Sequence, residues 1–358
     1  MRFIFKTKYD QDIRLFKHGG TVFWYALLVV GLIAAPLVLD RYLMSQATFV
    51  FIYAIAGIGL MLLSGYTGQI SLGHAAFFAV GSYTEAILLE KGVPFFISLP
   101  VSGLLAGAVG IVIGLPALRL AGIYLAIATL AFAFIVEEIL ARWESVTNGT
   151  LGMLVEPISV FGVELFREWH LYYVCLVVLV LVVLGAINLL RSPTGRAMIA
   201  IRDSEIAAQS MGVNLAKYKT IAFGISAAVT GLAGALYAHR LGYISPEAYT
   251  ILLSVEFLLL IVVGGLGSIH GAVFGAIFII VLPQMVSVLK GYMPSQIAEQ
   301  TGIDAGIFGL VIVLFMLYEP LGLYGRWVKI KLYFSTFPMY RKSTFKRQKS
   351  YTKTDRLR

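Results

Sequence analysis

The sequence has few of the residues on which most soluble enzymes depend. Charged residues make up only 13% of the 358 residues, and there is a single cysteine, Cys175, which excludes an intrachain disulfide. The chain contains no Gly-Lys dipeptide and therefore no Walker A loop, and it contains neither an HExxH nor a G-x-S-x-G motif. Nucleotide hydrolysis through a P-loop, zinc proteolysis and serine hydrolysis are without support. We expect no catalytic residue, no metal site and no cofactor.

Apolar residues are abundant instead. They make up 59% of the chain, and the mean hydropathy is +0.86. Soluble domains carry about 25% charged residues, so this composition points to a lipid environment. A helix needs about 20 apolar residues to cross the hydrocarbon core of a bilayer. The sequence predicts an all-α, polytopic transmembrane helical bundle of about ten segments, at residues 21–39, 48–63, 74–89, 95–117, 122–141, 171–190, 220–240, 251–263, 271–288 and 304–322.

Lysine and arginine are unevenly distributed among the loops. If the N-terminus is cytoplasmic, 22 of the 28 Lys and Arg residues face the cytoplasm, in the leader 1–20, at Arg119, in the loop 191–219 and in the tail 326–358. This bias predicts an N-in and C-in orientation for the transmembrane domain, residues 21–325. The net charge of +9 lies mostly beside membrane segments, so we expect contact with membrane lipids and not with nucleic acid. A regulatory contact of the tail with a cytoplasmic protein stays open.

The loop 191–219 is the longest polar interruption between apolar segments, and it contains the signal of a short helix. Asp203 and Ser204 can cap the helix, and Glu205 in the first turn suits the helix dipole. Gly212 suits the position just after the helix ends. The loop is therefore predicted to hold a short helix between these caps.

One face of this helix would consist of small residues. Ala207, Ala208 and Met211 would share that face, while Glu205 and Gln209 would share another. An exposed helix with an alanine face is poorly suited to bury itself against its own chain and well suited to a groove on another protein. An ordinary connecting helix is the alternative.

Two regions combine glycine with polar residues at a density that would interrupt a lipid-facing helix. The first spans 64–83, and the second, 264–271, lies in the matching place of a second half, which suggests an internal duplication. Irregular backbone at membrane depth persists only when it is buried in protein or lines a wet path, although small residues also allow close helix packing. The candidates for lining a path through the membrane are Tyr66, Thr67, Gln69, Ser71, His74, Tyr124, Thr129, Glu256, Gly264, Gly265, Gly267 and Ser268.

Few ionisable residues lie deep inside the apolar segments. Glu256 is the clearest, and an acid at that depth is either functional or paired within the bundle. Glu85, Glu137 and Glu138 lie nearer to segment ends, where solvation at the interface accounts for them. A proton-coupled carrier would show several deep acids or histidines. A stand-alone ion-coupled carrier or channel is therefore the alternative class.

Five ordered motifs resemble those of the permease family of branched-chain amino-acid (leucine/isoleucine/valine) ABC importers, and more narrowly its M subunit type. The similarity runs from about Ile52 to Leu317. The motifs are GYTGQISLGHAAFFAVGSY (65–83), GLPALRLAGIYLAIATLAFAFIVE (114–137), TNGTLGM (147–153), SPTGRAMIAIRDSEIAAQSMGVN (192–214) and VVGGLGSIHGAVFGA (262–276).

The short helix of the loop 191–219 resembles the EAA loop of ABC permeases, which docks on the ATPase subunit. Ile206 departs from that pattern, because it separates the glutamate from the alanine pair. The residues that the resemblance implies in ATPase coupling are Asp203, Glu205, Ala207, Ala208 and Gly212.

The resemblance implies several partners. They are a second homologous permease subunit, two cytoplasmic ATPase subunits that hydrolyse the ATP, and an extracytoplasmic substrate-binding protein. We expect a multi-pass permease of a prokaryotic inner membrane that imports branched-chain amino acids and is not itself an enzyme. Urea and short-chain amide importers share the motifs and remain alternatives. A zwitterionic substrate needs compensation of its charges, which backbone groups and helix ends at the two glycine-rich breaks can supply.

Overall fold

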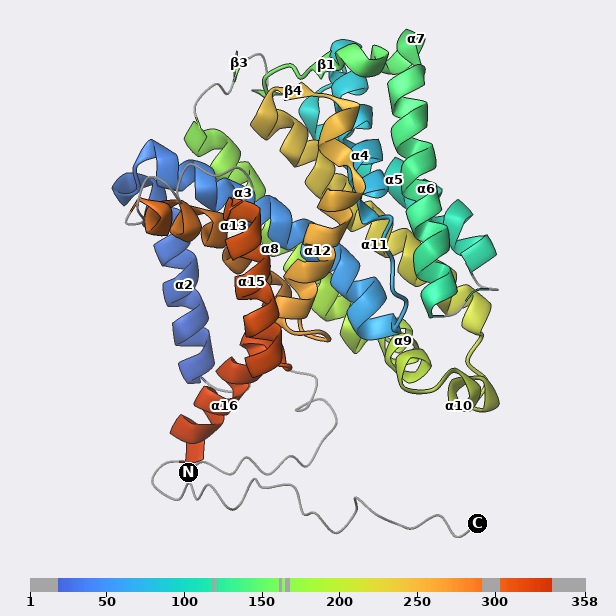
Figure 1. Ribbon diagram of the computed structural model, residues 1–358, viewed down its shortest axis with the longest axis vertical. Helices are drawn as coiled ribbons and strands as arrows, with labels where there is room; N and C mark the ends of the chain where they lie inside the picture. The colour runs from blue at the N-terminus through green and yellow to red at the C-terminus, as the bar shows by residue number, and fades with distance from the viewer. Residues whose placement is uncertain are drawn as a thin grey trace.

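Long apolar segments fold as helices because the backbone polar groups of a chain in lipid must be satisfied within the chain. The computed structural model describes residues 19–117, 120, 122–160, 163–164, 168–291 and 303–336, and these residues form a bundle of helices (Figure 1). Arg119, the leader up to residue 18 and the tail beyond residue 336 lie outside the described residues.

Each of the ten predicted apolar segments coincides with one long helix. Among the described residues, seven helical segments are long and apolar enough to cross a membrane, and the number is eight if a bent pair at the C-terminal end of the bundle is one span. An all-α polytopic bundle is therefore confirmed. The ten helices are α2 (Gly19–Val38), α3 (Arg41–Leu60), α4 (His74–Glu90), α5 (Phe95–Ala117), α6 (Ile123–Arg142), α8 (Glu168–Arg191), α11 (Leu215–Leu241), α12 (Ile251–Gly264), α13 (Ile269–Lys290) and α15 (Ile303–Tyr318).

The bent pair consists of α15 and α16 (Gly322–Thr336), whose axes differ by 44°. Pro320 lies in the break, where its ring and missing N–H do not allow the helix to continue. The predicted boundary between membrane domain and tail at residue 325 falls inside α16, so the first part of the basic tail is helical.

Short elements connect the long helices. The strand β1 (Met153–Leu154) pairs antiparallel with β4 (Tyr243–Ile244), and this pairing ties the loop after α6 to the end of α11. The other short elements are the helices α7 (Glu144–Thr147), α9 (Pro193–Asp203) and α10 (Glu205–Ser210), the 3-10 turns η2 (Gly149–Leu151) and η3 (Pro246–Tyr249), and the hairpin of β2 (Ser159–Val160) with β3 (Val163–Glu164).

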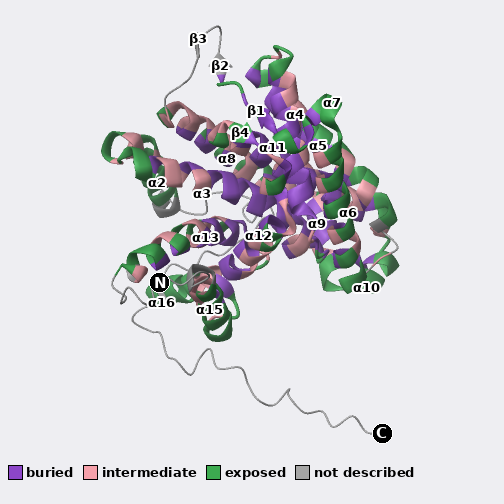
Figure 2. Ribbon diagram, turned by 45° about the horizontal axis from the view of Figure 1, so that its top comes forward, coloured by how far each residue is buried: buried purple, intermediate pink, exposed green. Residues whose placement is uncertain are grey.

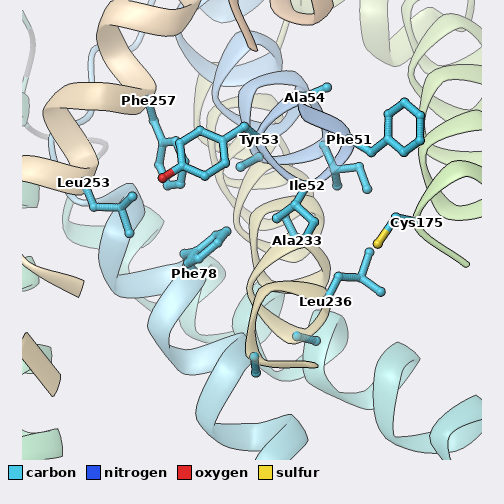
Figure 3. Packing of buried hydrophobic residues seen from close by; sticks show 14 of the residues in the cluster. Phe51, Ile52, Tyr53, Ala54, Phe78, Cys175, Ala233, Leu236, Leu253 and Phe257 are labelled. Atoms are coloured by element: carbon cyan, nitrogen blue, oxygen red, sulfur yellow. The ribbon is translucent and has the colours of Figure 1, made fainter. Parts of the chain in front are cut away.

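Helix α11 lies at the centre of the bundle, packed against α3, α4 and α5, and Figure 2 shows it mostly buried while α2, α10 and α16 are largely exposed. Small residues allow this close packing. A Cβ atom on Gly81 of α4 would overlap the backbone of Gly231 on α11, and one on Gly234 would overlap the carbonyl of Phe78. Apolar side chains of α3, α4 and α11 fill the remaining space (Figure 3).

Both glycine-rich regions interrupt helices, as predicted. Helix α3 ends in a π-helical turn, η1 (Met61–Gly65), and Gly68 follows with φ +76°. Gly265, with φ +113°, and Gly267, with φ +82°, separate α12 from α13. Glycine adopts such angles without a steric penalty. A Cβ atom on Gly65 would lie 2.9 Å from the backbone nitrogen of Gly267, so the two breaks touch each other.

Candidate coupling and translocation site

The short helix predicted in the polar loop is α10, and its ends are set by local hydrogen bonds. Ser204 caps it by accepting a hydrogen bond from the N–H of Ala207 at 3.3 Å. Gly212 follows its end with φ +84°, and the N–H of Val213 donates to the carbonyl of Ala208 at 3.0 Å, as in a Schellman motif. Of the two predicted caps, Ser204 therefore caps α10. Asp203 ends α9 instead.

The small-residue face expected on α10 is divided between two environments. Ala208 is only 3% exposed and packs against its own chain, whereas Ala207 is exposed. The large apolar side chains that face outward are those of Ile206, which is 81% exposed, and Met211, which is 85% exposed. Ile206 looked like an interruption of the sequence motif. In the fold it is the large apolar side chain that points outward from α10.

An ion pair between a buried lysine and a more exposed glutamate connects α10 with the central helix. The Nζ of Lys219 on α11 lies 2.6 Å from Glu205 Oε1, and the lysine side chain is only 7% exposed. A buried ammonium group without a partner would be strongly destabilising. Lys219 was counted in the sequence only as a loop charge, and its role as the partner of Glu205 was not predicted.

Arg202 at the end of α9 contacts both glycine-rich breaks. Its Nη1 donates to the carbonyl of Gly65 at 3.2 Å, and its Nη2 lies 2.9 Å from the Asp203 carboxylate. A Cβ atom on Gly68 would meet the Arg202 side chain at 3.3 Å, and one on Gly267 would meet Nη1 at the same distance. Glycine at both positions therefore leaves room for this side chain. Sequence reasoning missed this role, because nothing local marks Arg202.

The polar residues of the first break cross-link the interior of this chain. His74 Nδ1 lies 2.9 Å from the Ser71 hydroxyl, and His74 Nε2 lies 2.8 Å from the hydroxyl of Ser226 on α11, which donates to the carbonyl of Gly59. Ser71, His74 and Ser226 are all fully buried. These side chains hold the break against α3 and α11.

The remaining path candidates of the first half differ in exposure. Thr129, on α6, accepts a hydrogen bond from the N–H of Leu72 at 3.0 Å and is buried. Thr67 is also buried and donates to the carbonyl of Leu62 at 3.0 Å. Gln69 is 6% exposed, and its Nε2 atom has no hydrogen-bond partner in the described part of the chain. By contrast Tyr66 is half-buried, and Tyr124 is 69% exposed.

The second break is shaped by close backbone approach. Ser268 caps α13 by accepting a hydrogen bond from the N–H of Gly271 at 3.2 Å. A Cβ atom on Gly264 would overlap the backbone of Gly271, and one on Gly265 would lie 2.9 Å from the carbonyl oxygen of Leu321, before α16. The glycines predicted here are therefore required by packing as well as by backbone angle.

Glu256 lies near the middle of its membrane-spanning segment and is only half-buried. Its Oε2 accepts a hydrogen bond from the Tyr53 hydroxyl at 3.3 Å. An acid at the centre of a bilayer costs about 2.5 to 3.5 kcal/mol on insertion scales. This face of α12 therefore requires contact with protein or water and not with lipid.

Glu85 corrects an expectation, because interfacial solvation does not account for it. The residue is fully buried, and its carboxylate accepts hydrogen bonds from Ser98 at 2.6 Å and from Ser102 at 3.0 Å. His239 Nε2 lies 3.1 Å from the same carboxylate. This cluster joins α4, α5 and α11. The expectation holds better for Glu138, which is exposed and paired with Arg142.

Within the described residues, no group of three His, Cys, Asp or Glu side chains is placed to hold a metal ion. The described site consists of an exposed short helix, two touching breaks, and a few buried polar and charged side chains.

Comparison with known proteins identifies the family. The family model of the branched-chain amino acid transport system permease component matches residues 42–317. The chain is 37% identical over 334 residues to the high-affinity branched-chain amino acid transport system permease protein LivM of Escherichia coli K12, a match that covers 85% of this chain and 76% of that one.

More distant relatives include two further permeases. The probable LivM of Methanocaldococcus jannaschii is 26% identical over 305 residues, covering 83% of this chain and 82% of that one. The autoinducer 2 import system permease protein LsrC of Escherichia coli O9:H4 is 28% identical over 288 residues, covering 74% and 79%. No solved structure matches the chain significantly. The chain belongs to the permease family of branched-chain amino-acid transport systems.

Proposed function

We propose that this chain is a transmembrane permease subunit of an ATP-driven, binding-protein-dependent importer for branched-chain amino acids. The observation that carries the proposal is the 37% identity to LivM over 85% of the chain. In this proposal two separate cytoplasmic ATPase subunits hydrolyse ATP, a second homologous permease completes the passage, and an extracytoplasmic binding protein delivers the substrate. The complex lies in the inner membrane of a prokaryote.

The proposed topology has ten crossings, with both termini in the cytoplasm. The uneven distribution of lysine and arginine supports it. The contact of Arg202 with Gly65 also supports it, because it puts the polar loop and the first break on the same side. In Figure 1, α9 and α10 lie at the opposite end of the bundle from α7, β1 and β4.

We assign ATPase docking to α10 and its flanks. Ile206, Ala207 and Met211 supply an exposed apolar surface for a groove on the ATPase. Two contacts would transmit a movement of α10 to the membrane-spanning part of the chain. They are the ion pair of Glu205 with Lys219 on α11 and the hydrogen bond of Arg202 to the first break. Packed and charged contacts can carry energetic coupling between two sites, and these two contacts support the assignment.

The two breaks act in this proposal as one inner gate of the translocation path. Buried hydrogen bonds of Ser71, His74 and Thr129 fix the first break to α11 and α6. The glycines of the second break let it press against the first. The gate would therefore move as a unit when Arg202 moves, with Tyr66 as its more accessible side chain. The exposed Tyr124, on α6, would line the path beside it.

Other substrates stay open within the same architecture. The relative LsrC is named for autoinducer 2 import, so members of this family differ in what they carry. A urea or short-chain amide importer is the second candidate.

Assembly provides the first test of the proposed function. The chain should co-purify with the two ATPase subunits and the second permease encoded beside it. Cells that lack their own leucine uptake should regain it only when all the subunits are expressed. Leucine uptake by this chain alone, with no ATPase subunit present, would instead identify a stand-alone carrier.

A further inference from the structure

Three helices place an acid, a base and aromatic rings along one strip, whose residues are half-buried except for the buried Tyr53. Ser45, Phe49 and Tyr53 are spaced four residues apart on α3 and so share one face of that helix. Arg240 of α11 lies at the Ser45 end of the strip, and Glu256 of α12 lies at the Tyr53 end. At 1.5 Å per residue, the two ends are about 12 Å apart along α3.

The basic end has hydrogen-bonding capacity to spare. Arg240 is half-buried, its Nη2 donates to the Ser45 hydroxyl, and its guanidinium lies 5.0 Å from the centre of the Phe49 ring. Its Nε atom is buried without a hydrogen-bond partner. Among the described residues no carboxylate lies within ion-pair distance of Arg240. A guanidinium in this setting is suited to bind a carboxylate from outside the chain.

The acidic end complements it. Glu256 receives one long hydrogen bond, from Tyr53, and no basic side chain of the described residues forms an ion pair with it. Aromatic rings line the strip between the two charges: the centres of Phe49 and Tyr237 are 6.2 Å apart, and Tyr237 is half-buried. Figure 3 shows Tyr53 on α3 directed toward α12.

We propose that this strip binds the transported amino acid during its passage, an inference that rests on the proposed function. Arg240, at the outer end, binds the α-carboxylate of the substrate. Glu256, deeper in the membrane, binds the ammonium group. Phe49 and Tyr237, both half-buried, contact the apolar side chain, and the buried Tyr53 positions Glu256. Because the ends are farther apart than the charges of one amino acid, the substrate meets Arg240 first and Glu256 second. At each step the protein then compensates one charge of the substrate. A neutral amide substrate would need neither Arg240 nor Glu256.

The test uses the complete complex reconstituted in lipid vesicles, with its ATPases and its leucine-loaded binding protein. The measurement is leucine transported per ATP hydrolysed. Arg240→Gln and Glu256→Gln should each lower this ratio by about tenfold or more, since each removes a charge-assisted hydrogen bond to the substrate. Glu256→Asp should retain part of it. The matched controls Arg142→Gln and Glu138→Gln, on α6, should keep the wild-type ratio.

A second measurement does not depend on turnover. Ser45→Cys in a Cys175→Ala background replaces a hydroxyl by a thiol of similar size at the basic end of the strip. Leucine presented by the binding protein with ATP should slow its reaction with a small water-soluble thiol reagent. An unchanged transport ratio in both charge-removing variants, or an unchanged thiol reactivity on adding leucine, would overturn the proposed site. Absence of any leucine-dependent ATP hydrolysis in the wild type would instead overturn the proposed function, and the site with it.

Discussion

Single polar side chains with partners on other elements carry much of the specificity of this fold. Glu85, His239 and Lys219 have buried side chains and each finds its partner on another element, as does the more exposed Arg202. The three buried side chains depend on their partners, because a buried polar group without one is expensive. These residues are the ones for which reasoning from the sequence failed. Their partners are up to 154 positions away in the chain, so no local pattern marks them.

Removing the Glu85 carboxylate should destabilise the protein. Glu85→Ala would leave His239 Nε2 buried without the carboxylate that it contacts, at a cost of about 1 to 3 kcal/mol for an unsatisfied group, while Ser98 and Ser102 keep backbone carbonyls as acceptors. Thermal unfolding of the detergent-solubilised protein measures this as a lower midpoint temperature. Glu138→Ala is the control, because Glu138 is exposed and should change the midpoint little. Equal midpoints for the two variants would contradict the role assigned to Glu85.

Helices as elements were more predictable than single contacts. The ten apolar segments coincide with helices because apolar length is a local property of the sequence. The short helix α10 and both glycine-rich breaks were also predictable, from caps and from glycine. The sequence did not predict which side of α10 faces its own chain, because the burial of Ala208 depends on the packing of α10 against α9 and α11. The π-helical turn after α3 likewise has no signal in the sequence.

Close packing between α4 and α11 should depend on glycine at position 234. In Gly234→Ala the added methyl would overlap the carbonyl of Phe78, and overpacking costs about 1 to 3 kcal/mol. Gly185→Ala on α8 is the matched control, since its methyl would meet no atom within 4 Å. That change should leave stability the same or raise it by up to about 1 kcal/mol. A Gly234→Ala protein with a wild-type unfolding midpoint would show that α4 can move aside.

The exposed face of α10 should be required for ATPase binding. Ile206→Arg puts a charge where an apolar side chain would enter the partner's groove, so co-purification with the ATPase should fall about tenfold or more while insertion stays normal. Leu154→Arg, equally exposed at the other end of the bundle, should co-purify normally. Ala208→Arg would disturb the fold itself, because Ala208 is buried. Normal co-purification of Ile206→Arg would remove α10 from the proposed interface.

At the scale of the whole molecule, the two ends of the bundle should face opposite compartments. In a Cys175→Ala chain expressed without the ATPase subunits, a cysteine at Ile206 should react with an impermeant thiol reagent only when the reagent reaches the cytoplasmic face. A cysteine at Leu154 should react only from outside. The reason is the positive-inside distribution of lysine and arginine. Labelling of both cysteines from the same side of intact cells would contradict the proposed orientation.

The central claim is that ATP hydrolysis by the assembled complex is driven by a branched-chain amino acid. The most direct measurement is the ATPase rate of the complete complex in lipid vesicles, with the binding protein empty, loaded with leucine, isoleucine or valine, or replaced by a urea-loaded binding protein. Stimulation by the three amino acids and not by urea is the predicted result. Stimulation by urea alone would contradict the substrate and keep the architecture. No stimulation by any loaded binding protein would contradict the importer itself.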